Sequence, residues 1–144
     1  MQVGTEKIYN QAFEGRTDII SWDVIRIENE QLLKIRFISK NSNNRQGVRL
    51  AIDVGDGHLE INGISKKGME LWEDTAPKEI ICKCHTKSGL VSVYNIWDKG
   101  RGRQSLLLTS GMLIEKKGNV YIYHCNDYGY ETNFDKFIFS IELL

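Results

Sequence analysis

The stretches Val48-Arg49-Leu50-Ala51-Ile52 and His58-Leu59-Glu60-Ile61-Asn62 decide the fold class of this chain. Apolar and polar residues largely alternate in both, as they do where one face of a strand is buried and the other meets solvent. Ile35-Arg36-Phe37-Ile38 shows the same pattern. A helix would instead repeat its apolar residues every three or four positions. The alternation therefore predicts β-strands.

Runs rich in β-branched and aromatic residues continue this pattern along the chain. Short clusters containing Gly and Asn separate them, at the spacing of strands and turns in sandwiches and barrels. We expect a single all-β domain over 1–144, an antiparallel two-sheet β-sandwich of jelly-roll-like form, with a closed β-barrel as the alternative. The further runs cover 7–13, 19–27, 79–84, 90–97, 106–115, 119–125 and 137–143.

Composition and charge narrow the classes of partner. The 144 residues include 19 basic and 19 acidic side chains that are interspersed, so no positive field is available to attract a phosphate backbone. Apolar runs fall far short of the roughly 20 residues that span a bilayer as a helix. The sequence thus predicts neither nucleic acid nor membrane as a partner.

The first residues and the cysteines bear on the compartment. Residues 1–7 lack the basic region and apolar stretch of a secretory signal, which predicts a cytoplasmic protein, although removal of a signal and addition of a new Met would leave the same start. Three cysteines, Cys82, Cys84 and Cys125, are an odd number and cannot all pair. Free thiols in a reducing compartment are the simpler interpretation.

The segment 125–135 is rich in side-chain oxygens and precedes the last strand. Calcium takes 6–8 oxygen ligands from carboxylates, amides and backbone carbonyls, so this loop is a candidate calcium site. Its alternative is a polar connection, because Asp and Asn also build turns through their own backbone. The candidate ligands are first Asp127, Asn133 and Asp135, and then Asn126 and Glu131.

The same segment carries a resemblance. The pair Asn126-Asp127, then Asn133-Phe134-Asp135, then the alternating run 137–142 resemble the closing region of bacterial β-sandwich domains that hold calcium near a terminal strand. The resemblance is confined to this C-terminal segment, and Lys136 stands where a further acidic residue would complete it. It implies a calcium-stabilised sandwich that often binds carbohydrate.

Aromatic residues near strand ends suggest a ligand site. Planar rings stack on sugar faces, and neighbouring polar groups bind the hydroxyls. Tyr128 and Tyr130 lie in the polar loop, while Trp97 ends a strand and is followed by Asp98 and the basic turn that holds Arg101. These five residues are the predicted ligand-binding set. For any single aromatic the alternative is packing in the core or across strands, and for the basic turn it is a solvated hairpin tip.

Signatures of catalysis or of a known zinc motif do not stand out. Cys82, Cys84, His85, His124 and Cys125 could supply zinc ligands, but their spacing matches no usual finger or ribbon. The chain has neither Gly-x-Ser-x-Gly nor His-Glu-x-x-His, so no catalytic residue is assigned. The leading hypothesis is a non-catalytic binding module for carbohydrate or another polar ligand. The alternatives are a protein interaction or structural domain acting through a sheet face or edge, including a homo-oligomer, and a small enzyme.

Overall fold

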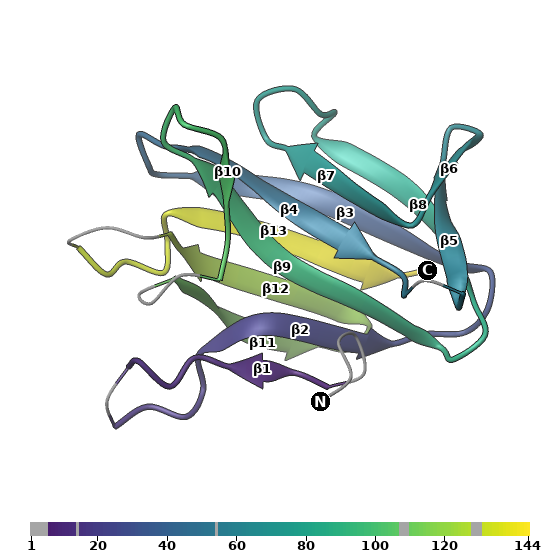
Figure 1. Ribbon diagram of the computed structural model, residues 1–144, viewed down its shortest axis with the longest axis horizontal. Coiled ribbons are helices and arrows are strands. Elements are labelled where there is room, and N and C mark those ends of the chain that lie inside the picture. Colours follow the sequence, from purple (N-terminus) through teal and green to yellow (C-terminus); the bar gives the residue numbers. More distant parts are fainter. Residues whose placement is uncertain (1–5, 14, 54, 107–109, 128–130) are drawn as a thin grey trace.

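A computed structural model describes residues 6–13, 15–53, 55–106, 110–127 and 131–144 (Figure 1). These residues form β-strands and no helix, which confirms the all-β class. Within the same ranges no helix is long and apolar enough to cross a membrane. The strands are β1 (Ile8–Tyr9), β2 (Ile20–Arg26), β3 (Gln31–Lys40), β4 (Arg45–Ala51), β5 (Gly57–Ile61), β6 (Ile64–Lys66), β7 (Gly68–Trp72), β8 (Glu79–Thr86), β9 (Leu90–Asp98), β10 (Arg103–Gln104), β11 (Gly111–Lys117), β12 (Val120–Asn126) and β13 (Phe137–Leu143).

All the strand pairs are antiparallel, and they join into one continuous sheet. Its order is β6-β5-β8-β3-β13-β12-β11-β2-β9-β4-β7, with β1 beside β2 and β10 beside β9. The sheet curls until β2, β9, β4 and β7 face the strands from β12 to β8 (Figure 1). This is a nearly closed barrel, the alternative architecture that the sequence predicted.

Two bent segments join the opposing walls of this barrel. In β2, Ile20 pairs with Met112 of β11, whereas the residues from Asp23 onward pair with β9. At the opposite side β6 pairs with β5, and β7 pairs with β4, although Lys67 alone separates β6 from β7 in the chain. The stretch from β6 to β7 therefore acts as one strand that changes partner at Lys67.

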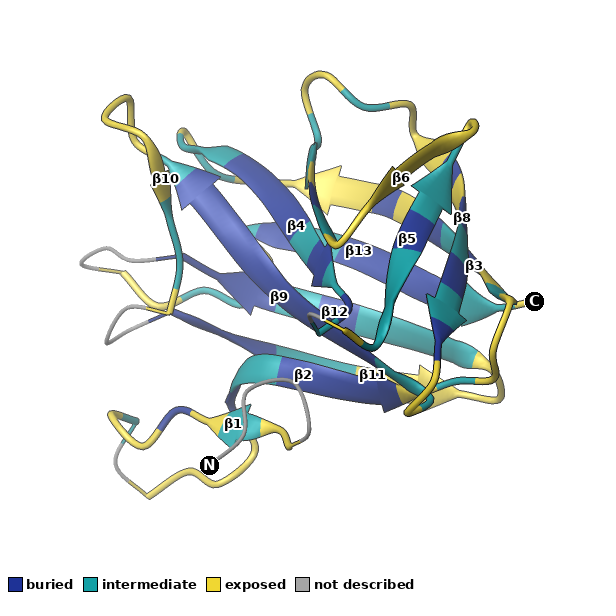
Figure 2. Ribbon diagram, turned by 45° about the vertical axis from the view of Figure 1, so that its right-hand side comes forward, coloured by how far each residue is buried: buried dark blue, intermediate teal, exposed yellow. Residues whose placement is uncertain are grey.

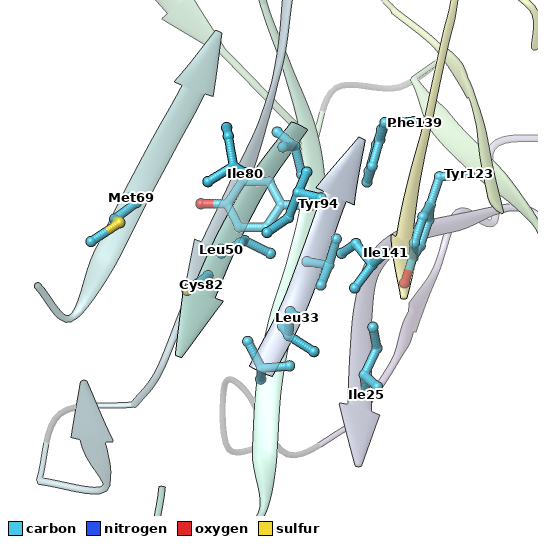
Figure 3. Close-up of a cluster of buried hydrophobic side chains, with 14 of the residues drawn as sticks. Ile25, Leu33, Leu50, Met69, Ile80, Cys82, Tyr94, Tyr123, Phe139 and Ile141 are labelled. Atoms are coloured by element: carbon cyan, nitrogen blue, oxygen red, sulfur yellow. The ribbon is translucent and has the colours of Figure 1, made fainter. Parts of the chain in front are cut away.

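A single hydrophobic core fills the interior. In β3 the alternation appears as expected: Leu33, Ile35 and Phe37 are buried, and Leu32 and Arg36 are exposed. Side chains from both walls meet in this core (Figure 3). The rings of Tyr123 and Phe139 stack there with centroids 4.7 Å apart. The interior is a packed core rather than a channel.

Burial is uneven around the barrel. Along β9 every residue from Val91 to Trp97 is buried. This strand has neighbours on both edges, β4 on one and β2 and then β10 on the other. All three residues of β6 are exposed, and β6 pairs only with β5 (Figure 2). The corner between β5 and β7 is therefore where the wall is least covered.

Candidate functional site

The structure gives Asp127 a different role from the predicted calcium ligand. Asp127 is buried, and its Oδ2 accepts hydrogen bonds from Ser42 Oγ (3.0 Å), Asn44 Nδ2 (3.0 Å) and Gln46 Nε2 (2.7 Å). Its Oδ1 accepts from Lys136 Nζ at 3.0 Å. The ammonium group of Lys136 thus supplies the positive charge that an ion would have supplied.

The charge state of Asp127 follows from these partners. Burial disfavours the carboxylate, but hydrogen bonds from Asn44, Lys136 and Gln46 and the charge of Lys136 outweigh burial and hold the pKa of Asp127 below its usual value. An ionised Asp127 ties the turn between β3 and β4 to the end of β12. Its role is structural.

The other predicted calcium ligands serve the local backbone. Asn126 Oδ1 accepts from the Asn133 N–H at 3.1 Å, and Asn133 Oδ1 accepts from the Asp135 N–H at 2.8 Å. The Glu131 carbonyl accepts from Lys136 Nζ. Among the described residues the carboxylates of Asp127, Glu131 and Asp135 do not come together around one point. These contacts support the alternative, a polar connection, for the described residues 126, 127 and 131–135, and the calcium site stays a prediction.

The structure describes three of the five residues predicted to bind a ligand, and it removes Trp97 from that set. Trp97 is fully buried, and its indole N–H donates to Gln104 Oε1 at 3.1 Å, so it offers no face to a ligand. Asp98 Oδ1 accepts from the N–H groups of Gly100 and Gly102 and shapes the hairpin, while Arg101 is exposed at the tip. Trp97 pairs with Gln46 of β4 on one side and with Gln104 of β10 on the other. The remaining two predicted residues, Tyr128 and Tyr130, lie outside the described residues.

A groove opens instead at the corner between β5 and β7. Asn62 and Gly63 form a two-residue turn between β5 and β6, with φ of 50° and 80°. Positive φ at both positions is typical of the tight hairpin turn that Asn-Gly favours. The chain then changes partner at Lys67, and the apolar side chains near this bend are incompletely covered. Ile64 is 59% exposed.

The groove has a volume of about 500 Å³ and combines two kinds of lining. A second hollow of about 340 Å³ shares Ile61, Asn62 and Leu71 with it and continues toward the start of β8. The apolar part of the larger groove consists of Ile61, Ile64, Met69, Leu71 and Trp72, and the polar part consists of Arg49, Asn62, Lys66 and Glu70, with Gly68 between them.

Two of the lining residues are held in place by neighbours. The guanidinium carbon of Arg45 lies 4.3 Å from the ring centroid of Trp72. Arg45 also forms an ion pair with Asp74, in which Nε lies 2.8 Å from Oδ1. Glu70 Oε1 lies 3.0 Å from Arg103 Nε and 3.8 Å from Arg49 Nη1. The ring and the carboxylate therefore have fixed positions before any ligand arrives, which lowers the entropy lost on binding.

Reasoning from the sequence missed this groove. The alternating pattern places Ile61 and Asn62 in the strand 58–62, and Trp72 is not among the residues predicted to bind a ligand. The Asn62-Gly63 dipeptide was the available signal for a hairpin. The described residues also hold one group of three metal-ligating side chains, His58, Glu60 and His85, on the outer face of the barrel.

Comparisons with known proteins add no relative. A scan against protein-family models, a search of curated proteins and a search of solved structures each found no match. No residue role is therefore transferred from another protein, and function is argued from the geometry of this chain.

Proposed function

We propose that this protein is a non-catalytic binding module that takes a small polar ligand in the groove between β5 and β7, and that the ligand is a carbohydrate. The observation that carries the proposal is the mixed lining of this groove. The half-buried Trp72 and the apolar side chains of Ile61 and Leu71 lie beside the polar groups of Arg49 and Asn62. A sugar presents both C–H faces and hydroxyls, and such a lining complements both.

Size and shape support the same class of ligand. Ligand sites commonly measure about 300–1,000 Å³, and a groove of about 500 Å³ falls in that range. The adjoining hollow of about 340 Å³ lengthens the site in one direction. An extended ligand of two or more sugar units would follow that direction.

The lining favours binding over catalysis. The described groove residues include no histidine or cysteine and a single carboxylate, Glu70. Glycoside hydrolysis commonly needs a pair of carboxylates, and acyl transfer needs a nucleophile beside a base. Glu70 is engaged by two arginines, so its role is to position Arg49 and Arg103.

The test is ligand-observed NMR with a panel of neutral and acidic oligosaccharides and the purified full chain. We expect at least one saccharide to give a binding signal with the wild type. Most of that signal should disappear with the Trp72→Ala variant. Tyr9→Ala is the matched control, because Tyr9 is a 49% exposed aromatic on β1, away from β7 (Figure 1). Absence of binding across the panel, or equal loss with both variants, would overturn the proposal.

A further inference from the structure

His58, Glu60 and His85 form a cluster on the outer face of the barrel, separate from the groove. His58 and Glu60 lie on β5, and His85 lies on β8. Leu59 lies between His58 and Glu60 in the sequence, and Cys84 directly precedes His85. Both are fully buried and face the core. Because successive side chains of a strand point to opposite faces, the three residues of the cluster share the outer face.

The strand register brings these side chains together. His58 and His85 are direct partners across the β5 and β8 pair, and their rings stack with centroids 4.3 Å apart. Glu60 follows two positions after His58, and its Oε1 lies 3.2 Å from His85 Nε2. One ligand atom from each residue lies within 4.8 Å of the others.

We propose that His58, Glu60 and His85 bind a divalent transition metal ion, of which Zn²⁺ fits the donor set best. Two imidazoles and a carboxylate are the ligands of open zinc sites, in which water or another molecule takes the fourth position. Zinc bonds of about 2.0–2.2 Å place the donor atoms of a tetrahedral site roughly 3.4 Å apart, so donors that now lie within 4.8 Å of one another must approach by up to about 1.4 Å. Rotation of the half-buried Glu60 and His side chains provides that movement.

The surroundings allow an ion to reach this cluster and hold the strand end that carries His85. His58 and His85 also line a surface hollow of about 480 Å³, which Asp56 and Lys87 border. The Asp56 carboxylate accepts hydrogen bonds from Thr86 Oγ1 and Ser88 Oγ, each at 2.7 Å, and so fixes the end of β8 next to His85.

The lysine opposite Glu60 and the cysteines do not conflict with the site. Lys83 lies opposite Glu60 on the same face, and its long side chain can extend into solvent. Cys82, Cys84 and Cys125 are free and buried in the core, so none of them joins the cluster. The zinc set that sequence alone suggested is thus divided by the sheet, and only His85 belongs to the site proposed here.

The test measures binding of Zn²⁺ alone by competition with a chromophoric chelator, on the tag-free full chain after removal of metal. We expect one equivalent to bind with micromolar affinity, and His58→Ala, His85→Ala and Glu60→Gln each to weaken it at least about tenfold. Co²⁺ in place of Zn²⁺ should give the visible absorption of a four- or five-coordinate ion, and His85→Ala should abolish that absorption.

His124→Ala is the matched control. His124 also lies between two carboxylates, but Glu115 faces its Nε2 at 3.5 Å and Asp135 faces its Nδ1 at 3.4 Å, so the two do not converge on one position. The His124→Ala variant should bind Zn²⁺ as the wild type does. Lack of binding by the folded wild type, or loss of affinity with His124→Ala and not with His58→Ala, would overturn the proposal. These outcomes are independent of saccharide binding.

Discussion

Gly57 of β5 lies so close to the His85 carbonyl of β8 that a Cβ atom at position 57 would be 1.7 Å from that oxygen. This contact sets the distance between β5 and β8 beside the His58 and His85 pair. A side chain at position 57 would force the two strands apart. Glycine at this position thus connects the packing of the sheet with the geometry of the cluster.

Gly57→Ala should therefore destabilise the fold by about 1–3 kcal/mol, the usual effect of an inserted group in a packed position. It should also weaken Zn²⁺ binding. Gly63→Ala provides the comparison, since its Cβ would meet nothing within 4 Å and the substitution affects only a turn of positive φ. Urea denaturation and the chelator assay measure both effects. Equal zinc affinity in the two variants would contradict this reading of Gly57.

Asp127→Asn should reduce the free energy of unfolding by about 2–4 kcal/mol, because it leaves the largely buried Lys136 ammonium without its counter-charge. Asp18→Asn removes a carboxylate from an equally short ion pair, with Arg16, but both partners are exposed there. That variant should match the wild type in urea denaturation. A small effect of Asp127→Asn would show that the pair with Lys136 is not a structural element.

Lowering the pH should reduce the stability of the wild type more than that of the Asp127→Asn variant. The folded-state pKa of Asp127 is lowered, so the unfolded chain takes up this proton first as the pH falls. The contribution of Asp127 is complete above the ordinary aspartate pKa of about 3.9 and is lost as the pH falls through the lower folded value. Asp56 acts in the same direction, since its hydrogen bonds from Thr86 and Ser88 lower its pKa against the effect of burial. Urea midpoints measured from pH 7 to pH 3 should therefore fall less steeply in the variant, and parallel curves would count against this account.

Calcium should not stabilise the protein, because Lys136 and three uncharged donors already occupy the oxygens of Asp127. An ion present at 100 times its Kd would add about 2.7 kcal/mol to the stability. Such a gain would raise the melting temperature by several degrees. We expect the melting temperature after EDTA treatment to be the same with and without millimolar calcium. A clear rise with calcium would restore the segment 126–135 as a candidate site.

The three thiols should be inert in the folded protein. Cys82, Cys84 and Cys125 are each 0% exposed, so a reagent cannot reach their sulfurs in the folded protein. Burial also raises the pKa of Cys125 well above its usual value, whereas a hydrogen bond from Cys84 lowers the pKa of Cys82. A thiol-reactive dye should therefore react with none of them at pH 8 within minutes, and with all three in urea. Rapid reaction of one thiol in buffer would show that the core opens locally.

Local patterns predicted the strands well. The alternation around Phe37, Leu50 and Leu59 placed the core face of β3, β4 and β5 where the structure has it. The same patterns could not show that β6 and β7 take different partners, since that change depends on β4 and β5. Whether the strands form a two-sheet sandwich or a nearly closed barrel depends on this change of partner.

The roles of the candidate site residues were harder to predict, because many of the groups that contact them are distant in sequence. Three of the four donors to Asp127 come from Ser42, Asn44 and Gln46, more than eighty positions earlier. A local count of oxygens could not include them. Likewise, the local sequence does not show that Trp97 is fully buried between β4 and β10. His58 and His85 are brought together only by the register of β5 with β8.

The most direct test of the central claim is an amide and indole NMR titration of isotope-labelled protein with the best saccharide of the panel. The account predicts shifts at the Trp72 indole and the Asn62 amide that saturate together, with Trp72→Phe used to assign the indole signal. The segment 131–135 and the tip around Arg101 should not shift. Shifts confined to that segment or that tip, with Trp72 unchanged, would contradict the account.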